Sequence, residues 1–443
     1  MAGLNVLYIH SHDTGRLIEP YGYPFAAPNL QRFAEDGVLF RQAFSAAPTC
    51  SPSRAALLTG RHPHCCGMHG LVNAGHSLKD PSRHLANFLR RSGYRTALAG
   101  IQHVAMPPWS DPQALGYDEF LDHNGDGKPG DFARIADVAA AYLNRSHHRP
   151  FFLSVGFVET HRRSVVADPT LKQRAFTYDP DADPLSVDTR YVRSPAWLPD
   201  TPVMREDAAN FADGVRRLDQ KVGALLRALE RTGLRETTLV IITTDHGVAM
   251  PHAKCNLTDL GVGVMLMMRG PRDGIWSGGK VIDAMVTHLD VFPTICDEAG
   301  VEKPGWLQGR SLLPLVRGDV QRLHDVIFAE QGYHGHRDAQ RAVRNERYKY
   351  IRRLDCASIR VPDTEAPSTR WFSRLGYAAR PAGRELLYDL WFDPLEQHNL
   401  SADSGHAAVL VEMREHLDRW MENTDDPFRH GDLPPQPADL EQI

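Results

Sequence analysis

The sequence predicts an α/β protein in which helices flank a mostly parallel mixed sheet. Up to about residue 320, short apolar runs typical of buried strands alternate with segments of helical periodicity. Beyond that point, several shorter β-like runs follow one another before a last helical segment. These observations divide the chain into a large domain over residues 1–320 and a smaller carboxyl-terminal α+β subdomain over residues 321–443.

The elements can be placed one by one from apolar spacing and from glycines near the helix ends. In the large domain the expected strands are Val6–Ile9, Thr96–Ala99, Phe151–Val155 and Thr238–Thr243. Its expected helices are Asn29–Asp36, His84–Ser92, Ile135–Leu143 and Glu206–Arg231. In the subdomain we expect the strands Val326–Glu330, Tyr348–Arg352 and Leu386–Asp389, followed by the helix Ala407–Asn423.

The composition is that of an ordinary soluble globular protein. Apolar residues make up 42% of the 443 residues, and a net charge of −5 gives no reason to expect nucleic-acid binding. Apolar runs stay short of the roughly 20 residues that span a bilayer, and the amino terminus lacks the pattern of a secretory signal. The cysteines form neither a disulfide framework nor zinc spacing: Cys50, Cys65, Cys66, Cys255, Cys296 and Cys356. We therefore expect a cytoplasmic protein without membrane or nucleic-acid partners, and the sequence leaves homo-oligomerisation open.

Polar side chains that can carry chemistry lie just beyond the ends of several expected strands. His12 and Asp13 follow the first strand, His161 follows Phe151–Val155, and Asp245 with His246 follows Thr238–Thr243. Parallel sheets bind their ligands beyond the carboxyl ends of their strands. The sequence therefore predicts a polar site at this edge of the sheet.

One motif is more specific than the rest of the chain. Cys50-Ser51-Pro52-Ser53-Arg54 precedes a helix-like Ala/Leu run, and this pattern resembles the type I sulfatase signature. The resemblance implies an alkaline-phosphatase-like fold and a formylglycine that a formylglycine-generating enzyme makes from Cys50. Its hydrate would attack sulfur, and Arg54, one helical turn on, would hold that hydrate. The alternative interpretation is a small half-buried cysteine at a helix start.

The resemblance also implies one divalent metal ion. Asp245-His246-Gly247 matches the Asp-Asn/His-Gly motif of sulfatases, and His12-Asp13 stands where they usually carry Asp-Asp. The ligands would then be His12, Asp13, Asp245, His246 and the converted Cys50. The family implies calcium, whereas two histidines favour manganese or zinc, because calcium prefers oxygen ligands. Alternatively, His12 only forms a hydrogen bond with Asp13.

Three further side chains match sulfatase positions that contact sulfate or move protons. His161 or Lys254 would protonate the leaving group, His103 would act as base, and His161 and Lys254 would also bind substrate. His103 belongs to the equivalent of a Gly-Lys-x-His motif, but Ile101 replaces the lysine. Three side chains are candidates to replace that cation in substrate binding: Gln102, Arg16 and Arg162.

Within the family, the chain is most similar to the sulfamidase (heparan N-sulfatase) branch. The likeness continues through Gly67–Leu71, Asp393–Glu396 and Trp420–Pro427. It implies a small-molecule or saccharide sulfate ester, or a sulfamate, as substrate. Two alternatives stay open: a phosphonate monoester or phosphodiester hydrolase on the same fold, and a catalytically silent binding protein.

Overall fold

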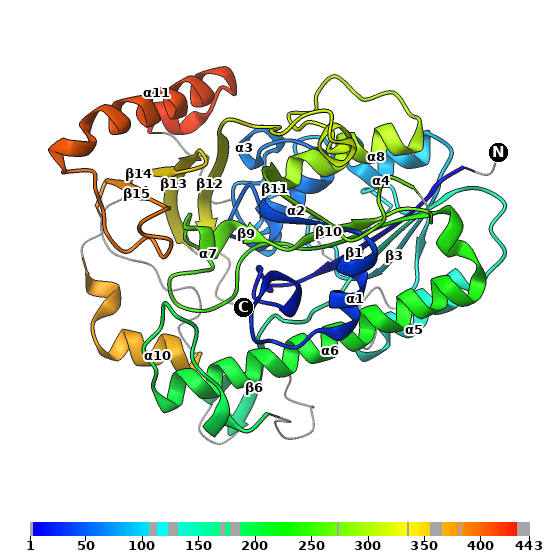
Figure 1. The fold of residues 1–443 in the computed structure, drawn as a ribbon, viewed down its shortest axis with the longest axis horizontal. Helices are drawn as coiled ribbons and strands as arrows, with labels where there is room; N and C mark the ends of the chain where they lie inside the picture. The colour runs from blue at the N-terminus through cyan, green and yellow to red at the C-terminus, as the bar shows by residue number, and fades with distance from the viewer. Residues whose placement is uncertain are drawn as a thin grey trace.

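The computed structural model shows a large mixed sheet covered by helices, with a small antiparallel sheet at one end (Figure 1). It describes residues 3–105, 113–122, 132–168, 173–177, 187–272, 274–334, 336–354, 366–380 and 383–431. Cys356 lies outside these residues. Within them, no helix is both long enough and apolar enough to cross a bilayer.

The described part of the chain forms a nine-stranded sheet in the order β11-β2-β10-β8-β1-β5-β3-β4, with β9 paired to β2. The strands are β1 (Asn5–Ser11), β2 (Val38–Phe44), β3 (Arg95–Gly100), β4 (Glu119–Phe120), β5 (Phe151–Gly156), β8 (Thr238–Thr244), β9 (Gly263–Val264), β10 (Leu266–Arg269) and β11 (Lys280–Thr287). Strands β8, β1, β5 and β3 are neighbours and run parallel. β10 runs antiparallel to both of its neighbours, β8 and β2. The predicted mostly parallel mixed sheet is confirmed.

Helices cover both faces of this sheet (Figure 1). One face carries α1 (Pro28–Asp36), α5 (Ile135–Leu143) and α6 (Pro202–Thr232), and the other carries α2 (Cys50–Thr59), α4 (Leu85–Arg91) and α8 (Val291–Ala299). Alternate residues of β1 enter the two cores, Leu7 and Ile9 on one side and Val6 and Tyr8 on the other. The remaining α-helices and strands that the structure describes in this region are α3 (Pro63–Cys66), β6 (Arg163–Asp168), β7 (Gln173–Thr177), α7 (Asp259–Val262) and α9 (Leu313–Arg317).

The carboxyl-terminal part forms its own antiparallel sheet. In the described residues this sheet has four strands: β12 (Ile327–His334), β13 (His336–Arg344), β14 (Tyr348–Arg353) and β15 (Glu385–Asp389). The helix α10 (Pro367–Arg374) precedes β15, and α11 (Ala407–Asn423) packs on β13 and β14. Val343, Tyr350 and Leu387 share one core with Leu417 and Trp420 of α11. The predicted α+β character of this region is confirmed.

Candidate active site

Four neighbouring parallel strands deliver the candidate residues to one edge of the sheet. β8 leads to Asp245 and His246, β1 to His12 and Asp13, and β5 and β3 to the loops that carry His161 and His103. These side chains therefore converge because their strands are adjacent and point the same way.

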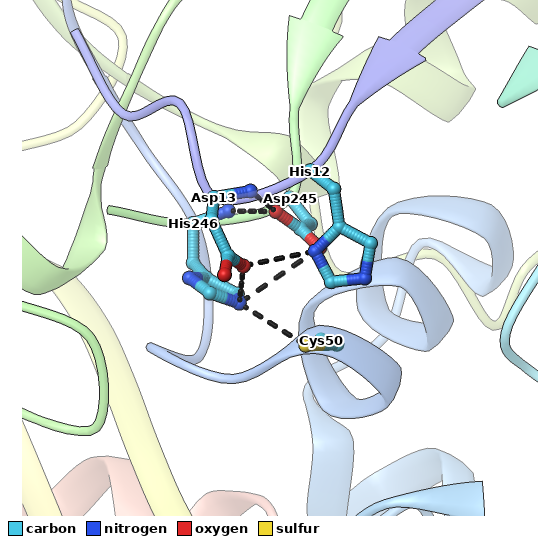
Figure 2. Close-up of side chains that lie close together, drawn as sticks. All are labelled: His12, Asp13, Cys50, Asp245 and His246. Carbon is cyan, nitrogen blue, oxygen red and sulfur yellow. Dashed lines mark hydrogen bonds and ion pairs between the residues drawn. The ribbon is translucent and has the colours of Figure 1, made fainter. Parts of the chain in front are cut away.

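Five side chains form a compact group at this edge (Figure 2). His12, Asp13, Cys50, Asp245 and His246 are all buried, and each offers a ligand atom within 4.8 Å of the others. His12 Nδ1 lies 2.8 Å from Asp13 Oδ1 and 3.1 Å from Asp245 Oδ2. His246 Nε2 lies 3.2 Å from Asp13 Oδ1 and 3.3 Å from Cys50 Sγ. The structure thus brings together all five residues predicted as metal ligands.

The tautomer of His246 suits a metal ligand. Its Nδ1 lies 2.9 Å from the Gly247 carbonyl oxygen, so Nδ1 carries the proton and donates it there. Nε2, the other ring nitrogen, faces Asp13 and Cys50. Hydrogen bonds of this kind orient imidazoles that bind metals. Two carboxylates with two imidazoles therefore fit a divalent cation.

The charges of the group are balanced by two buried cations. Burial alone would raise the pKa of Asp13, but the Lys254 ammonium, 2.8 Å from Asp13 Oδ2, and the nearby imidazoles hold it well below its usual range. Burial also opposes ionisation of Asp245, and His12, His246 and Arg54 together lower its pKa. Both carboxylates are therefore ionised at neutral pH.

The imidazoles of His12 and His103 are uncharged, because the pKa of each is lowered. Burial lowers the pKa of His12 to about 3, although the Asp245 carboxylate opposes this shift. Burial, with His12 and Arg54 nearby, lowers the pKa of His103 well below its usual value. Both rings are neutral at pH 7 and can bind a metal or accept a proton.

Arg54 is buried and binds Asp245. Its Nη2 and Nε donate to Asp245 Oδ2 at 2.9 and 3.2 Å, and Nη2 also donates to the Ser11 carbonyl oxygen at 3.2 Å. Nη1 donates to Nδ1 of His10, a buried histidine of β1 that the sequence analysis did not single out. The guanidinium therefore fixes the Asp245 carboxylate next to Cys50. Ser53 contributes a further unpredicted contact, because its hydroxyl donates to the Asp245 carbonyl oxygen at 2.5 Å.

Cys50 stands at the first residue of α2 and is 2% exposed. Burial, together with the Asp13 and Asp245 carboxylates, raises the pKa of its thiol, against the opposing effect of Lys254. Since a reactive cysteine needs a lowered pKa, this side chain is poorly placed to act as a thiolate. Its position at a helix N-terminus does suit an anion such as sulfate.

Three backbone features hold the loops that carry the candidate residues. Asp13 has φ 58°, in the left-handed region that non-glycine residues rarely adopt, and such strain is frequent at functional sites. Gly247 is needed for a close approach, because a Cβ there would lie 1.8 Å from the Leu260 carbonyl oxygen. Cys255 donates its N–H to the Pro48 carbonyl oxygen at 3.0 Å, which ties the Lys254 loop to the segment before Cys50.

His161 and His103 complete one side of the site. The rings of His12 and His161 lie 4.3 Å apart between centroids, and those of His12 and His103 lie 5.9 Å apart. His161 Nε2 is 3.9 Å from Asp13 Oδ2, and its side chain is 34% exposed, in contrast to the buried ligands. It is therefore placed to meet a substrate that enters from solvent.

The side chains proposed to replace the cation missing at Ile101 engage other partners. The Gln102 amide bonds to the backbone of its own loop, accepting from the N–H of Val104 and Ala105 and donating to the Ala105 carbonyl. Arg162 donates to Asp207 Oδ2 at 2.7 Å within the core. Arg16 donates to the Arg41 carbonyl oxygen. In the part of the chain that the structure describes, two arginine or lysine side chains lie at hydrogen-bond distance from a carboxylate of the group: Arg54 at Asp245 and Lys254 at Asp13.

Comparison with known families agrees with this geometry. Residues 5–301, more than half of the chain, match the family described as Sulfatase. The chain belongs to the sulfatase family. Residues 254–364 also match the family described as N-sulphoglucosamine sulphohydrolase, C-terminal. Human N-sulphoglucosamine sulphohydrolase is 31% identical over 446 residues, which cover 91% of this chain and 86% of that protein. The chain is thus a hydrolase of sulfuric esters, as the sequence predicted.

Solved structures show the same fold. One of them, in complex with its substrate D-glucosamine-2-N,6-O-disulfate, gives a TM-score of 0.69 at 18% identity and covers 96% of this chain and 98% of its own. The phosphonate monoester hydrolase of Agrobacterium radiobacter gives 0.67 at 21% identity, with 95% and 96% covered. The predicted alkaline-phosphatase-like fold of this sulfatase is confirmed.

Proposed function

We propose that this sulfatase hydrolyses a sulfate ester or sulfamate on a saccharide, with formylglycine made from Cys50 as nucleophile. The observation that carries the proposal is the placement of Cys50, buried at a helix start and 3.3 Å from His246 Nε2, inside the group of candidate metal ligands. As a thiol this residue has a raised pKa and no use as a nucleophile. As formylglycine, its hydrated aldehyde supplies a hydroxyl that can attack sulfur.

His12, Asp13, Asp245 and His246, with the oxygen of the converted Cys50, would hold one divalent cation. Such a cation lowers the pKa of the attacking hydroxyl and neutralises sulfate oxygens. His12 offers a ligand atom within 4.8 Å of those of the other four residues, which places it close enough to share a cation with them. We therefore favour manganese or zinc over the calcium that the family implies.

Around that cation the protein side chains have distinct tasks. Arg54 fixes Asp245 through two N–H donors, and Lys254 holds its ammonium 2.8 Å from Asp13, where it can also bind a sulfate oxygen. His161, whose side chain is 34% exposed, would donate a proton to the leaving oxygen or nitrogen. His103, neutral because of burial, would accept the proton released when sulfate departs.

The proposed substrate class rests on the relatives. Human N-sulphoglucosamine sulphohydrolase is named for a sulfated glucosamine, and a structure of the same fold holds D-glucosamine-2-N,6-O-disulfate. We propose an N- or O-sulfated amino sugar as the first substrate to test, offered beside 4-nitrophenyl sulfate. A formylglycine-generating enzyme must act on the chain first, because Cys50 itself is encoded as cysteine.

The decisive experiment combines the mass of the Cys50 peptide with the activity of a variant. Conversion to formylglycine lowers the peptide mass by about 18 Da, which reports the nucleophile directly. Cys50→Ala should abolish turnover while the protein stays folded, because the change removes a small buried group. Cys296→Ala, at a buried cysteine of α8, is the matched control and should keep turnover. Turnover by Cys50→Ala would overturn the proposal.

A second candidate function is phosphonate monoester or phosphodiester hydrolysis. Ile101, which is 7% exposed, stands where the sulfatase pattern has a sulfate-binding lysine, and a phosphonate monoester hydrolase shares the fold. A sulfate ester presents three non-bridging oxygens and a phosphonate monoester presents two, so the phosphonate offers one oxygen fewer for a cation to bind. Comparison of kcat/KM for 4-nitrophenyl sulfate and a phenyl phosphonate ester separates the two. A phosphonate preference above about tenfold, roughly 1.4 kcal/mol, would reverse the assignment.

A further inference from the structure

His10 is a buried histidine of β1 whose side chain lies between the sheet and α2. Alternation along the strand places it on the same face as Val6 and Tyr8, which belong to the core beneath α2. Its ring stacks on that of Tyr8, with centroids 4.9 Å apart, and the residue is 3% exposed. The side chain therefore reaches Arg54 from within the protein and not from the substrate side.

The ring of His10 occupies space that Gly156 leaves free. The two residues pair across the parallel strands β1 and β5. A Cβ at residue 156 would lie 2.6 Å from Cε1 and 2.9 Å from Nε2 of His10, so any side chain there would displace the ring. Contacts with Tyr8, Gly156 and Arg54 thus hold the imidazole in one place.

The partner of Nδ1 decides the tautomer of His10. Nη1 of Arg54 lies at hydrogen-bond distance from this nitrogen, and a guanidinium can only donate. Nδ1 must therefore accept, and the proton of the ring is on Nε2. Burial, together with the charge of Arg54, lowers the pKa of His10 well below its usual value, so the ring is neutral at pH 7.

A buried histidine beside a carboxylate shows the opposite case. His64 of α3 bonds through Nδ1 to Glu330 Oε2 of β12. Burial opposes the charge on His64, but the Glu330 carboxylate raises the pKa of the imidazole to about 10. His64 is thus a cation in an ion pair, whereas His10 is a neutral acceptor that faces a cation.

The contact with His10 anchors the end of Arg54 that its other partners leave free. A guanidinium has five N–H donors in one plane. Nε and Nη2 donate to Asp245 Oδ2, and Nη2 also donates to the Ser11 carbonyl oxygen. Nη1 donates to His10. Without His10, the buried Nη1 loses this acceptor, and the guanidinium is free to tilt about its contacts with Asp245.

We propose that His10 is a positioning residue of this sulfatase, which fixes the plane of Arg54 and, through Arg54, the Asp245 carboxylate beside Cys50. The inference rests on the function proposed above, in which Arg54 and Asp245 serve the converted Cys50. His10 acts through Arg54 and needs no contact with the substrate. Its role is to orient the arginine before the substrate binds, because the ring itself is held by Tyr8 and Gly156.

Two variants of His10 separate the acceptor from the bulk of the ring. His10→Leu fills much of the space without an acceptor, and His10→Asn keeps an amide oxygen near the position of Nδ1. Turnover of 4-nitrophenyl sulfate is measured at saturating metal and divided by the formylglycine content of each protein. Since a small displacement of a catalytic group costs about 100-fold in rate, His10→Leu should lose about 10–100-fold in kcat. KM should change less than about threefold, and His10→Asn should restore kcat to within about fivefold of the wild type.

His84→Leu is the matched control. His84 is fully buried and neutral, because burial lowers its pKa to about 3, and its Nδ1 accepts the N–H of Ala86 at the start of α4. This variant should lose stability and keep kcat. A second readout needs no turnover: nitrogen NMR of the histidine rings, with the His10 signal identified by its loss in His10→Asn, should show the proton on Nε2.

A loss of kcat in His10→Leu that His10→Asn restores, with the proton on Nε2, supports the proposal. It is overturned if His10→Leu keeps kcat within threefold, if both variants lose kcat equally, or if Nδ1 carries the proton. Should His10→Leu not fold, the kcat of His10→Asn and the ring tautomer decide. A wild type that contains formylglycine but has no turnover would contradict the proposed function instead, and the tautomer alone then tests the contact of His10 with Arg54.

Discussion

Lys254→Met tests the cationic side of the catalytic site most directly. The substitution removes the ammonium but keeps an unbranched apolar side chain of similar length. In the structure, Lys254 is 1% exposed and its Nζ lies 2.8 Å from Asp13 Oδ2. The variant therefore loses a buried cation that we assign to the sulfate group and that also compensates the charge of Asp13, a proposed metal ligand.

The magnitude follows from these two roles. Loss of one preorganised donor to the charge of a transition state costs about 2.7–4 kcal/mol, or roughly 100–1,000-fold in kcat. Removal of one partner from a buried ion pair costs about 3–5 kcal/mol of folding free energy, because the other charge is left uncompensated. A bound divalent cation would compensate Asp13 in place of Lys254. The free energy of unfolding of Lys254→Met should therefore fall strongly in the presence of a chelator and only slightly in the presence of the metal. The loss in kcat should remain when the metal is present.

The assay is 4-nitrophenyl sulfate turnover at saturating metal, together with thermal unfolding with and without EDTA. Lys349→Met is the matched control, because Lys349 is equally buried and binds Asp259 and Glu396 at 2.5 and 2.9 Å, outside the catalytic group. It should lose stability in both conditions and keep kcat. The reasoning fails if Lys254→Met keeps kcat within threefold, or if Lys349→Met loses as much.

Two further predictions concern metal preference and pH. His12→Asp replaces an imidazole of the candidate metal site by a carboxylate. After chelation, Ca²⁺ should therefore restore activity better than Mn²⁺ in the variant, and Mn²⁺ better than Ca²⁺ in the wild type. Equal rescue of both proteins by Ca²⁺ would show that His12 is not a ligand. The His64–Glu330 pair should stabilise the fold most between about pH 4.5 and 6.5. Because the Glu330 carboxylate raises the pKa of His64 to about 10 against the opposing effect of burial, this stability is full below pH 6.5 and is lost as the pH rises toward 10. Burial opposes a low pKa at Glu330, but the charges of His64 and Arg341 lower it, so on the acid side stability is lost as the pH falls below about 4.5. Urea unfolding of the wild type and of Glu330→Gln at pH 5.5 and 9.5 measures this effect. The free energy of unfolding should differ between the two proteins by about 3–5 kcal/mol at pH 5.5 and by less at pH 9.5. An equal difference at both pH values would contradict the ion pair between His64 and Glu330.

The sequence predicted the central parallel strands and several helices, and it missed other strands of both sheets, among them β10 and β13. Ile135–Leu143 and Ala407–Asn423 match α5 and α11 in both bounds, since each has clear helical periodicity. Strands β2 and β11 were not predicted. In β2, exposed Arg41 interrupts the apolar run, and the first five residues of β11 are exposed or half-buried because it is the edge strand next to β2. Alternation of this kind is a weak signal without knowledge of the neighbouring strand.

The candidate site was predictable where short motifs carry the chemistry. Cys50, Asp13, Asp245 and His246 were expected together because each stands in a motif or beyond a strand, and the structure brings them within 4.8 Å. His10 was missed because it lies inside a buried strand, and its contact with Arg54 joins residues 44 positions apart. Such contacts depend on tertiary packing, which residue spacing along the chain does not encode.

The two departures from the sulfatase pattern offset each other in charge. The pattern has a carboxylate at the position of His12 and an ammonium at the position of Ile101, and both are replaced here by uncharged groups, since burial keeps His12 neutral. The site thus loses one negative and one positive charge, and Asp13 and Asp245 stay matched by Lys254 and Arg54. A lysine retained at 101 without the acidic partner would add an unpaired cation to a buried site, which is costly. The absence of the lysine at Ile101 therefore balances the replacement of a carboxylate by the neutral His12, and it is no sign that the site is silent.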